Sequence, residues 1–287
     1  MPLNLIKGQY RVAHSAPDGD SVHFFPDNPA AFTSLHLRVH LGSGGSAQLR
    51  LDAIDALETH YTPPAHGAKT MHQPLELAHA AGARLLDLLG FTDVVRDGET
   101  VVSATPDAVP GYILTRFADK YGRPVCLAYA GPTGQADLAA VFTDDGLLRG
   151  SVNYRLLAEG LVYPTFYSQL YPDLRAELTT AAGNARDAKA GVWAADATTT
   201  GATINALADL TDQLVILPKL FRRLAEYFAL SAGSVSLDGF AGFLASHDDR
   251  LYVISDAHAT GFDNVITVDG QTVRLGKDIT DLIFVEG

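Results

Sequence analysis

The sequence is poor in cysteine, tryptophan, methionine and basic side chains. Cys126 is its only cysteine, and it has one tryptophan and two methionines. No disulfide bond can therefore form within the chain, which suits a reducing compartment. The 21 lysine and arginine residues are outnumbered by 33 aspartate and glutamate residues, and the net charge is −12. This charge argues against a protein that binds nucleic acid through a broadly basic surface.

Long apolar runs are also missing. No segment approaches the ~18 consecutive apolar residues of a membrane-spanning helix, so we expect no membrane association. The first eight residues, Met-Pro-Leu-Asn-Leu-Ile-Lys-Gly, have neither the apolar stretch nor the cleavage site of a signal peptide. We therefore expect a cytoplasmic protein, with secretion as the alternative if the start of the chain was trimmed.

The chain is long enough for two parts. Its 287 residues exceed the usual size of one domain, and its 47% apolar residues are enough for a sizeable core. The stretch Ala-Thr-Thr-Thr-Gly-Ala-Thr at 197–203 has the composition of a linker. We predict a first domain over residues 1–196, a linker over 197–204 and a C-terminal module over 205–287. The 13 acidic and 6 basic residues from position 196 onward give this last part most of the negative charge.

Turn and capping signals predict an α+β first domain. Strands are expected on both sides of the turn Pro17–Asp20, and then at 35–41, at 47–54 and repeatedly within 92–127. Three helices are expected: from Pro74 to a stop at Gly90, from a Ser151 cap to 159, and from Pro172 to Gly191. Strands in this number with three helices favour a small barrel covered by helices.

The C-terminal module is expected to be small and α/β-rich. Residues 205–230 have helical character in two pieces around Pro218, and short apolar runs follow, with a hairpin turn at Asp269-Gly270. The module is a candidate for self-association, for binding a protein partner or for a lid over a site. We interpret Phe221-Arg222-Arg223-Leu224 as one face of an amphipathic helix.

Three separate motifs carry the chemistry. They are Asp18-Gly19-Asp20-Ser21, Arg50-Leu-Asp-Ala-Ile-Asp55-Ala-Leu-Glu58-Thr59 and Asp119-Lys-Tyr-Gly-Arg123. Taken alone, Asp18-Gly19-Asp20 is explained by a surface turn, Asp55 and Glu58 by loop or helix-capping carboxylates, and Arg50 by a solvent-facing strand arginine.

Together, the motifs offer what phosphodiester cleavage requires. Asp20 and Asp55 are oxygen ligands for a hard cation, with Asp18 orienting bound water. Glu58 can activate water, and Arg50 and Arg123 can hold phosphoryl oxygens through their planar guanidinium groups.

In order and spacing, the three motifs resemble those of the staphylococcal-type (micrococcal) nuclease family. The resemblance covers about residues 10–195 and continues in Asn153, Glu159-Gly160-Leu161, Leu174-Arg175 and Gly191-Val192-Trp193. It implies an OB-type five-stranded barrel with three helices, and a calcium-dependent nuclease that hydrolyses single-stranded DNA and RNA.

The resemblance also implies individual roles. The calcium ligands would be Asp20, Asp55 and the backbone carbonyl of Ala56, and Glu58 would be the general base. Arg50 and Arg123 would clamp the phosphate. Lys120 and Tyr121 would contact the terminal phosphate of a bound nucleotide. Tyr163, Phe166 and Tyr167 only approximately match the rings that stack on a base, without indicating which one stacks, and ordinary core aromatics beside Pro164 are the alternative.

Some features depart from the family pattern. Ala56 replaces a residue with a hydroxyl group, the stretch between Asp20 and Arg50 is long, and the acidic balance predicts binding that depends strongly on the cation. A non-catalytic scaffold that binds nucleic acid or protein is the alternative. Retention of both ligands, the base and both clamps favours the enzyme.

Overall fold

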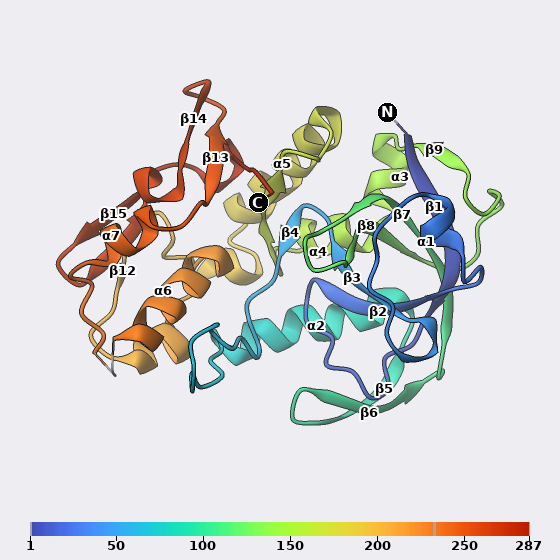
Figure 1. Cartoon of the computed structure of the whole chain (residues 1–287), viewed down its shortest axis with the longest axis horizontal. Coiled ribbons are helices and arrows are strands. Elements are labelled where there is room, and N and C mark those ends of the chain that lie inside the picture. The colour runs from blue at the N-terminus through green and yellow to red at the C-terminus, as the bar shows by residue number, and fades with distance from the viewer. Residues whose placement is uncertain (1, 232–233, 287) are drawn as a thin grey trace.

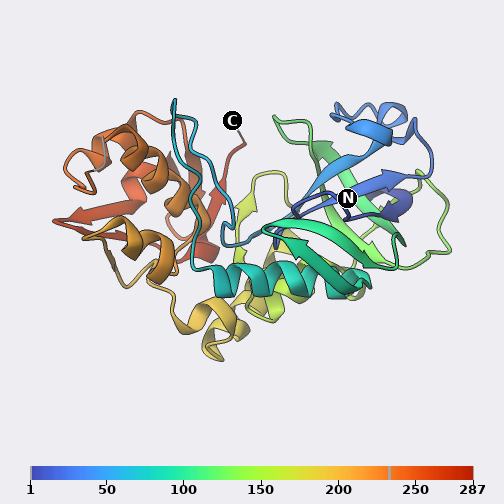
Figure 2. The same ribbon diagram turned by 90° about the horizontal axis from the view of Figure 1, so that it is seen from below.

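The computed structural model describes residues 2–231 and 234–286. It is an α+β structure whose two parts lie at opposite ends of its long axis (Figures 1 and 2). The first part, blue to yellow, is built on a barrel, and the second, orange to red, combines helices with short strands. No helix among the described residues has both the length and the apolar character needed to cross a membrane.

Five strands of the first part form a closed mixed barrel. The strand order is β2-β3-β8-β7-β1, and pairing of β1 with β2 closes it; β3 and β8 are parallel, and the other pairs are antiparallel. A short strand, β9, pairs antiparallel with the first residues of β1. The bounds are β1 Pro2–Tyr10, β2 Ser21–Pro26, β3 Ala47–Leu51, β7 Val109–Ala118, β8 Pro124–Ala130 and β9 Ala140–Phe142.

The three helices expected in this part are present. They are α2 Leu75–Leu89, α4 Val152–Ala158 and α5 Pro172–Asp187. The hydroxyl of Ser151 accepts a hydrogen bond from the backbone N–H of Tyr154 at 3.1 Å, as expected for an N-cap. Gly90 ends α2 in the left-handed region with φ 101°, a conformation that glycine adopts without steric cost. Two short helices were not predicted: α1 Ala31–Ser34 and α3 Asp145–Arg149.

Two strand predictions in the first part are wrong in detail. Residues 35–41 form no strand: His36 has a left-handed φ of 57°, and the N–H of Leu37 bonds back to the carbonyl of Phe32, so the chain turns instead of extending. The strand before the Pro17–Asp20 turn is β1, which ends at Tyr10. A hairpin of β5 Thr92–Asp97 and β6 Thr100–Thr105 follows α2, as expected.

Among its described residues, the C-terminal part contains two α-helices, a π-helical turn at Asp209–Gln213 and strands of two small sheets, one of which also includes β11 of the first part. Helix α6 begins at Pro218, as predicted. A hairpin joins β15 to β16 as predicted, but its loop is Gly270-Gln271, one residue beyond the expected Asp269-Gly270 turn. One sheet has the order β11-β17-β13-β14 and the other β12-β16-β15. The bounds are α6 Pro218–Leu230, α7 Phe240–Ala245, β11 Phe166–Tyr167, β12 Ala202–Thr203, β13 Arg250–Val253, β14 His258–Gly261, β15 Ile266–Asp269, β16 Thr272–Leu275 and β17 Leu282–Phe284.

The two parts share a hydrophobic core. Leu57 and Trp193 of the first part belong to the same buried cluster as Ile216 and Phe221 of the second. Strand β17 near the C-terminus pairs in parallel with β11 of the first part. Residues 197–204 are packed as well, because β12 pairs with β16 and Ile204 is fully buried. Independent folding of the two parts stays a prediction, but their shared core fixes α6 against the first part.

Candidate active site

The barrel topology brings the three motifs to one end of three adjacent strands. Ser21, at the start of β2, pairs with Arg50 near the end of β3, and Arg50 pairs with Val125 near the start of β8. Asp20 precedes β2 and Arg123 precedes β8. Asp20 lies about 30 residues before Arg50, and Arg123 lies about 70 residues after it. Because β2 and β8 flank β3, these three segments meet at the same end of the barrel.

The Asp-Gly-Asp turn is held by its own side chain and by tight packing. The Asp18 Oδ1 atom accepts hydrogen bonds from the backbone N–H groups of Asp20 and Ser21 at 3.2 and 2.8 Å. A Cβ atom at Gly19 would lie 2.6 Å from the Cβ of Ala56 and 2.7 Å from that of Ala81 on α2. Asp18 therefore shapes the turn, and Gly19 lets the turn approach the helix. The role of Asp18 in orienting water stays a prediction.

The Asp20 carboxylate links the first two motifs. Its Oδ2 atom accepts a hydrogen bond from the backbone N–H of Ala56 at 3.1 Å. Burial and the nearby carboxylates of Asp18 and Asp55 raise the pKa of Asp20 well above its ordinary value. Among residues 2–231 and 234–286, no basic side chain forms an ion pair with it. Asp20 is thus a carboxylate whose ionised form would be favoured by a cation.

The third motif forms a turn organised by Asp119. Its carboxylate accepts hydrogen bonds from the backbone N–H groups of Tyr121 and Arg123 at 3.0 and 2.9 Å, and from the Arg123 Nε atom at 2.7 Å. Gly122 has a φ of 77°, and an added Cβ there would lie within 3.0 Å of atoms of His40. The turn needs glycine for both reasons.

The Tyr121 ring is 63% exposed and lies beside two cations. The Lys120 Nζ atom and the Arg123 Cζ atom are 5.6 and 5.5 Å from its centroid. An exposed ring next to basic groups suits contact with a nucleotide.

The Asp55 and Glu58 carboxylates are bound by an arginine from the C-terminal part. On α6, Arg222 donates from Nη1 and Nη2 to the two Asp55 carboxylate oxygens at 3.1 and 2.8 Å, and from Nη1 to Glu58 Oε1 at 2.6 Å. Burial raises the pKa of Glu58; Arg222 opposes this effect and Asp55 adds to it.

Arg50 is also partnered within the chain. Its guanidinium carbon lies 4.6 Å from the centroid of the Tyr167 ring, and its Nη1 atom lies 3.6 Å from Glu286 Oε1. Tyr167 therefore stacks on the expected phosphate clamp, and Glu286 places a carboxylate where a phosphate is expected.

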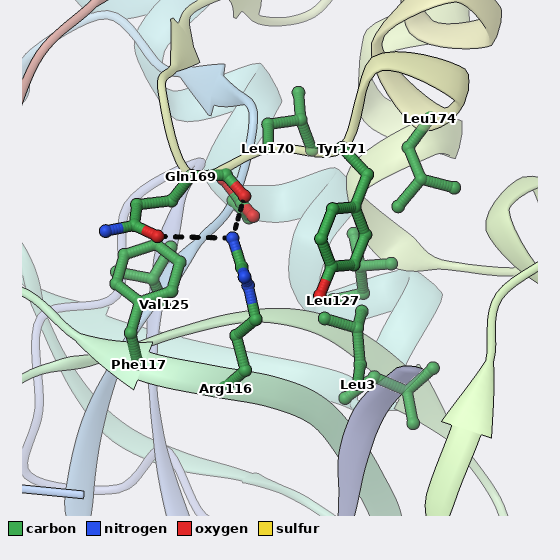
Figure 3. A pocket seen from close by; sticks show the side chains of 11 residues that line it. Leu3, Arg116, Phe117, Val125, Leu127, Gln169, Leu170, Tyr171 and Leu174 are labelled. Carbon is green, nitrogen blue, oxygen red and sulfur yellow. Dashed lines mark hydrogen bonds between the residues drawn. The ribbon is translucent and has the colours of Figure 1, made fainter. Parts of the chain in front are cut away.

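These groups line one cleft of about 550 Å³ between the two parts. The first part contributes Asp18, Asp20, Gln48, Arg50, Asp55, Ala56, Glu58, Tyr61, Asp119, Lys120, Tyr121, Arg123 and Tyr167, and the second contributes Lys219, Arg222, Arg223, Glu226, Asp248, Asp249, Val285 and Glu286. A second pocket, beside Arg116 and Gln169, is shown in Figure 3. Its volume of about 10 Å³ is no more than one water occupies, so the large cleft is the better candidate for a ligand site.

Tyr163, one of the approximate matches for a ring that stacks on a base, does not line this cleft. It is completely buried, its hydroxyl donates to Asp196 Oδ1 at 2.7 Å, and its ring packs edge-on against Trp193 at 5.2 Å between centroids. Its position between β4 (Ile54–Asp55) and the shared core leaves no face for a base, so the expected role is corrected to a structural one.

The sequence motifs did not reveal three contributors to the site: Arg222, Glu286 and Gln73. The Gln73 side chain is fully buried; its Oε1 atom accepts from the Glu58 N–H at 3.2 Å, and its Nε2 atom donates to the Ile216 carbonyl at 2.8 Å. It therefore connects the Glu58 backbone to the segment before α6. The basic pair within the amphipathic α6 pattern was the available signal for Arg222, and nothing in the sequence indicated its partner.

Calcium fits the chemistry of this donor set. Carboxylate and carbonyl oxygens are the ligands it prefers, and the Asp20 carboxylate has no cationic partner among the described residues. Both Asp55 oxygens, however, are bound by Arg222. In this arrangement the described part of the chain holds no cluster of three or more carboxylate, histidine or cysteine side chains positioned for a metal ion.

Comparison with known proteins adds no assignment to this cleft. No protein-family model matches the chain, and a search of curated proteins finds no significant match.

Proposed function

We propose that the protein is a calcium-dependent nuclease of the staphylococcal type, with an OB-type barrel, that hydrolyses phosphodiester bonds of single-stranded DNA or RNA. The proposal is carried by one observation: a single cleft at one end of the closed barrel contains Asp20, Arg50, Asp55, Glu58 and Arg123. These side chains come from three segments that are far apart in the sequence and that the barrel brings together. They also include every type of group that the reaction requires.

Each residue has a defined task in this mechanism. Arg50 and Arg123 donate hydrogen bonds to the phosphoryl oxygens as their negative charge grows. Water attacks the phosphorus and a proton of the water passes to Glu58. The raised pKa of Glu58 favours this proton transfer. The bond to the leaving oxygen breaks, and that oxygen takes up a proton from the solvent to leave as the alcohol. Asp20, Asp55 and the Ala56 carbonyl would hold calcium, which supplies positive charge near the phosphate when bound.

The size and lining of the cleft favour a short stretch of single strand. A volume of about 550 Å³ is within the range of small-molecule sites, roughly 300–1,000 Å³. The exposed Tyr121 ring between Lys120 and Arg123 offers a stacking surface with adjacent positive charge, which is how single-stranded nucleic acid is commonly held. Nine carboxylates and six basic side chains line the cleft, so bound cations should strengthen substrate binding.

The test is digestion of heat-denatured DNA and of RNA by the full chain, with calcium and with a chelator. Glu58→Gln should lower the rate by about 10²–10⁴-fold, and Arg123→Ala by about 10²–10³-fold. Arg149→Ala is the matched control, because Arg149 pairs with Glu177 outside the cleft. Absence of calcium-dependent cleavage by the wild-type protein would refute the proposal. Wild-type rates in both site variants would place the chemistry elsewhere.

One observation favours the alternative, a non-catalytic nucleic-acid- or protein-binding scaffold. Arg222 and Glu286 satisfy charges on both sides of the cleft, as expected if the charged groups serve the fold. A scaffold would bind a labelled single-stranded oligonucleotide or a protein partner but leave the oligonucleotide intact at all calcium concentrations. An enzyme would shorten it.

A further inference from the structure

The Arg222 guanidinium group occupies the oxygens of Asp55, which are the atoms that we expect to bind calcium. It contacts both oxygens of Asp55 and one oxygen of Glu58, at 2.6 to 3.1 Å. A charged fork on two carboxylates in this geometry makes strong, charge-assisted hydrogen bonds. The Arg222, Asp55 and Glu58 side chains are only 24%, 5% and 18% exposed, so water screens the interaction weakly.

The helix that carries Arg222 is fixed in place. Leu220, Phe221 and Leu224 of α6 are fully buried in the core shared by the two parts. Lys219 and Arg223 on the same helix both bind Asp249, at 3.0 and 2.5 Å. Movement of the whole helix would disrupt this packing, so release of Asp55 requires rotation of the Arg222 side chain alone.

The cleft provides space for that rotation. Arg222 lines the open volume of about 550 Å³ together with Glu226, which lies one turn further along α6 and already accepts hydrogen bonds from Tyr61 and Arg223. Residues four apart on a helix lie on the same face and form ion pairs readily. Rotation toward Glu226 would free both Asp55 oxygens without displacing the helix.

We propose that Arg222 competes with calcium for Asp55, and so sets the calcium concentration at which the site can act. The inference rests on the proposed calcium-dependent function and identifies a determinant of its metal requirement. Calcium cannot use Asp55 while both carboxylate oxygens accept from the guanidinium group. Each ion that binds there must therefore break an intramolecular ion pair, which weakens its apparent affinity.

Calcium binding by the full chain, measured by isothermal titration calorimetry, tests the competition directly. Loss of the charged hydrogen bonds in Arg222→Gln should tighten calcium binding by about tenfold or more. Arg223→Gln is the matched control: it removes the same charge one residue away, but Arg223 binds Asp249 and Glu226 and contacts neither Asp55 nor Glu58. Equal changes in both variants would reduce the effect to net charge, and unchanged affinity in Arg222→Gln would overturn the competition.

A second readout covers weak binding or poor folding. Calcium should raise the thermal midpoint of Arg222→Gln more than that of the wild type, since it replaces the lost partner of the buried Asp55 carboxylate. If Arg222→Gln does not fold, Arg222→Lys keeps the charge but cannot grip both Asp55 oxygens as a fork. It should still bind calcium more tightly than the wild type, and failure to do so contradicts the proposal.

The cleavage assay separates this inference from the proposed function. Tighter calcium binding by Arg222→Gln, without cleavage by any variant, would support the competition and refute the nuclease. Calcium-dependent cleavage by the wild type, with the same calcium affinity in Arg222→Gln, would do the reverse.

Discussion

Replacement of Gly19 by alanine tests the packing that positions the carboxylates. The new Cβ would lie 2.6 Å from the Cβ of Ala56 and 2.7 Å from that of Ala81. Both neighbouring atoms are attached directly to the backbone and cannot rotate away, so the turn or α2 must shift. Overpacking of this kind costs about 1–3 kcal/mol of unfolding free energy.

The same shift should displace Asp20, whose carboxylate depends on the Ala56 N–H at 3.1 Å. We expect the folded Gly19→Ala protein to bind calcium and cleave nucleic acid more weakly than the wild type.

Gly183→Ala provides a control with the opposite expected sign. Gly183 lies inside α5, and a Cβ atom there meets nothing within 4 Å. Alanine should therefore stabilise the helix by about 0.8–1 kcal/mol. Urea unfolding of the three proteins, with a common slope, gives the comparison. Wild-type stability and cleavage by Gly19→Ala would refute the reasoning that this turn is tightly packed against α2 and the second motif.

Three other substitutions probe the surroundings of the cleft. Tyr163→Phe should lower the unfolding free energy by about 1–2 kcal/mol, because Asp196 loses a part-buried hydrogen bond. Cleavage by the folded variant should stay at the wild-type rate, and a large loss of rate would restore the role of Tyr163 in substrate stacking. Gln73→Leu should cost about 1–3 kcal/mol in urea unfolding, because the Ile216 carbonyl and the Glu58 N–H lose their partner; wild-type stability would contradict that role. Burial raises the pKa of Asp52 from 3.8 to about 6. Its ionisation therefore has no effect on stability below pH 3.8, disfavours the folded state increasingly between pH 3.8 and about 6, and does so fully above about pH 6. Asp52→Asn should therefore stabilise the protein by up to about 3 kcal/mol at pH 8 and by little at pH 4, and equal gains at both pH values would contradict the assignment.

Local signals in the sequence were sufficient to locate several elements. The Ser151 cap, the Gly90 stop and the Pro172 start identified α4, α2 and α5, because these residues act on the backbone within one helical turn. The Asp269-Gly270 pair identified a hairpin to within one residue for the same reason. The prediction of a strand at 35–41 was wrong, because the alternation of apolar residues does not indicate the left-handed conformation of His36.

The sequence by itself identified five of the charged groups that line the cleft. Asp20, Arg50, Asp55, Glu58 and Arg123 were identified from motif order and spacing, and the barrel brings all five to one cleft. Their proposed roles follow from the chemistry of carboxylates and guanidinium groups, which does not depend on the rest of the fold.

Only the tertiary structure decided what those groups contact. Asp55 and Arg222 are 167 residues apart, and the α6 pattern predicted a helix with a basic face without specifying the surface it would meet. The burial of Tyr163 was hidden in the same way, because it depends on Trp193 and the shared core. Pairing over such distances is set by how the core packs, and periodicity records only which face of an element is apolar.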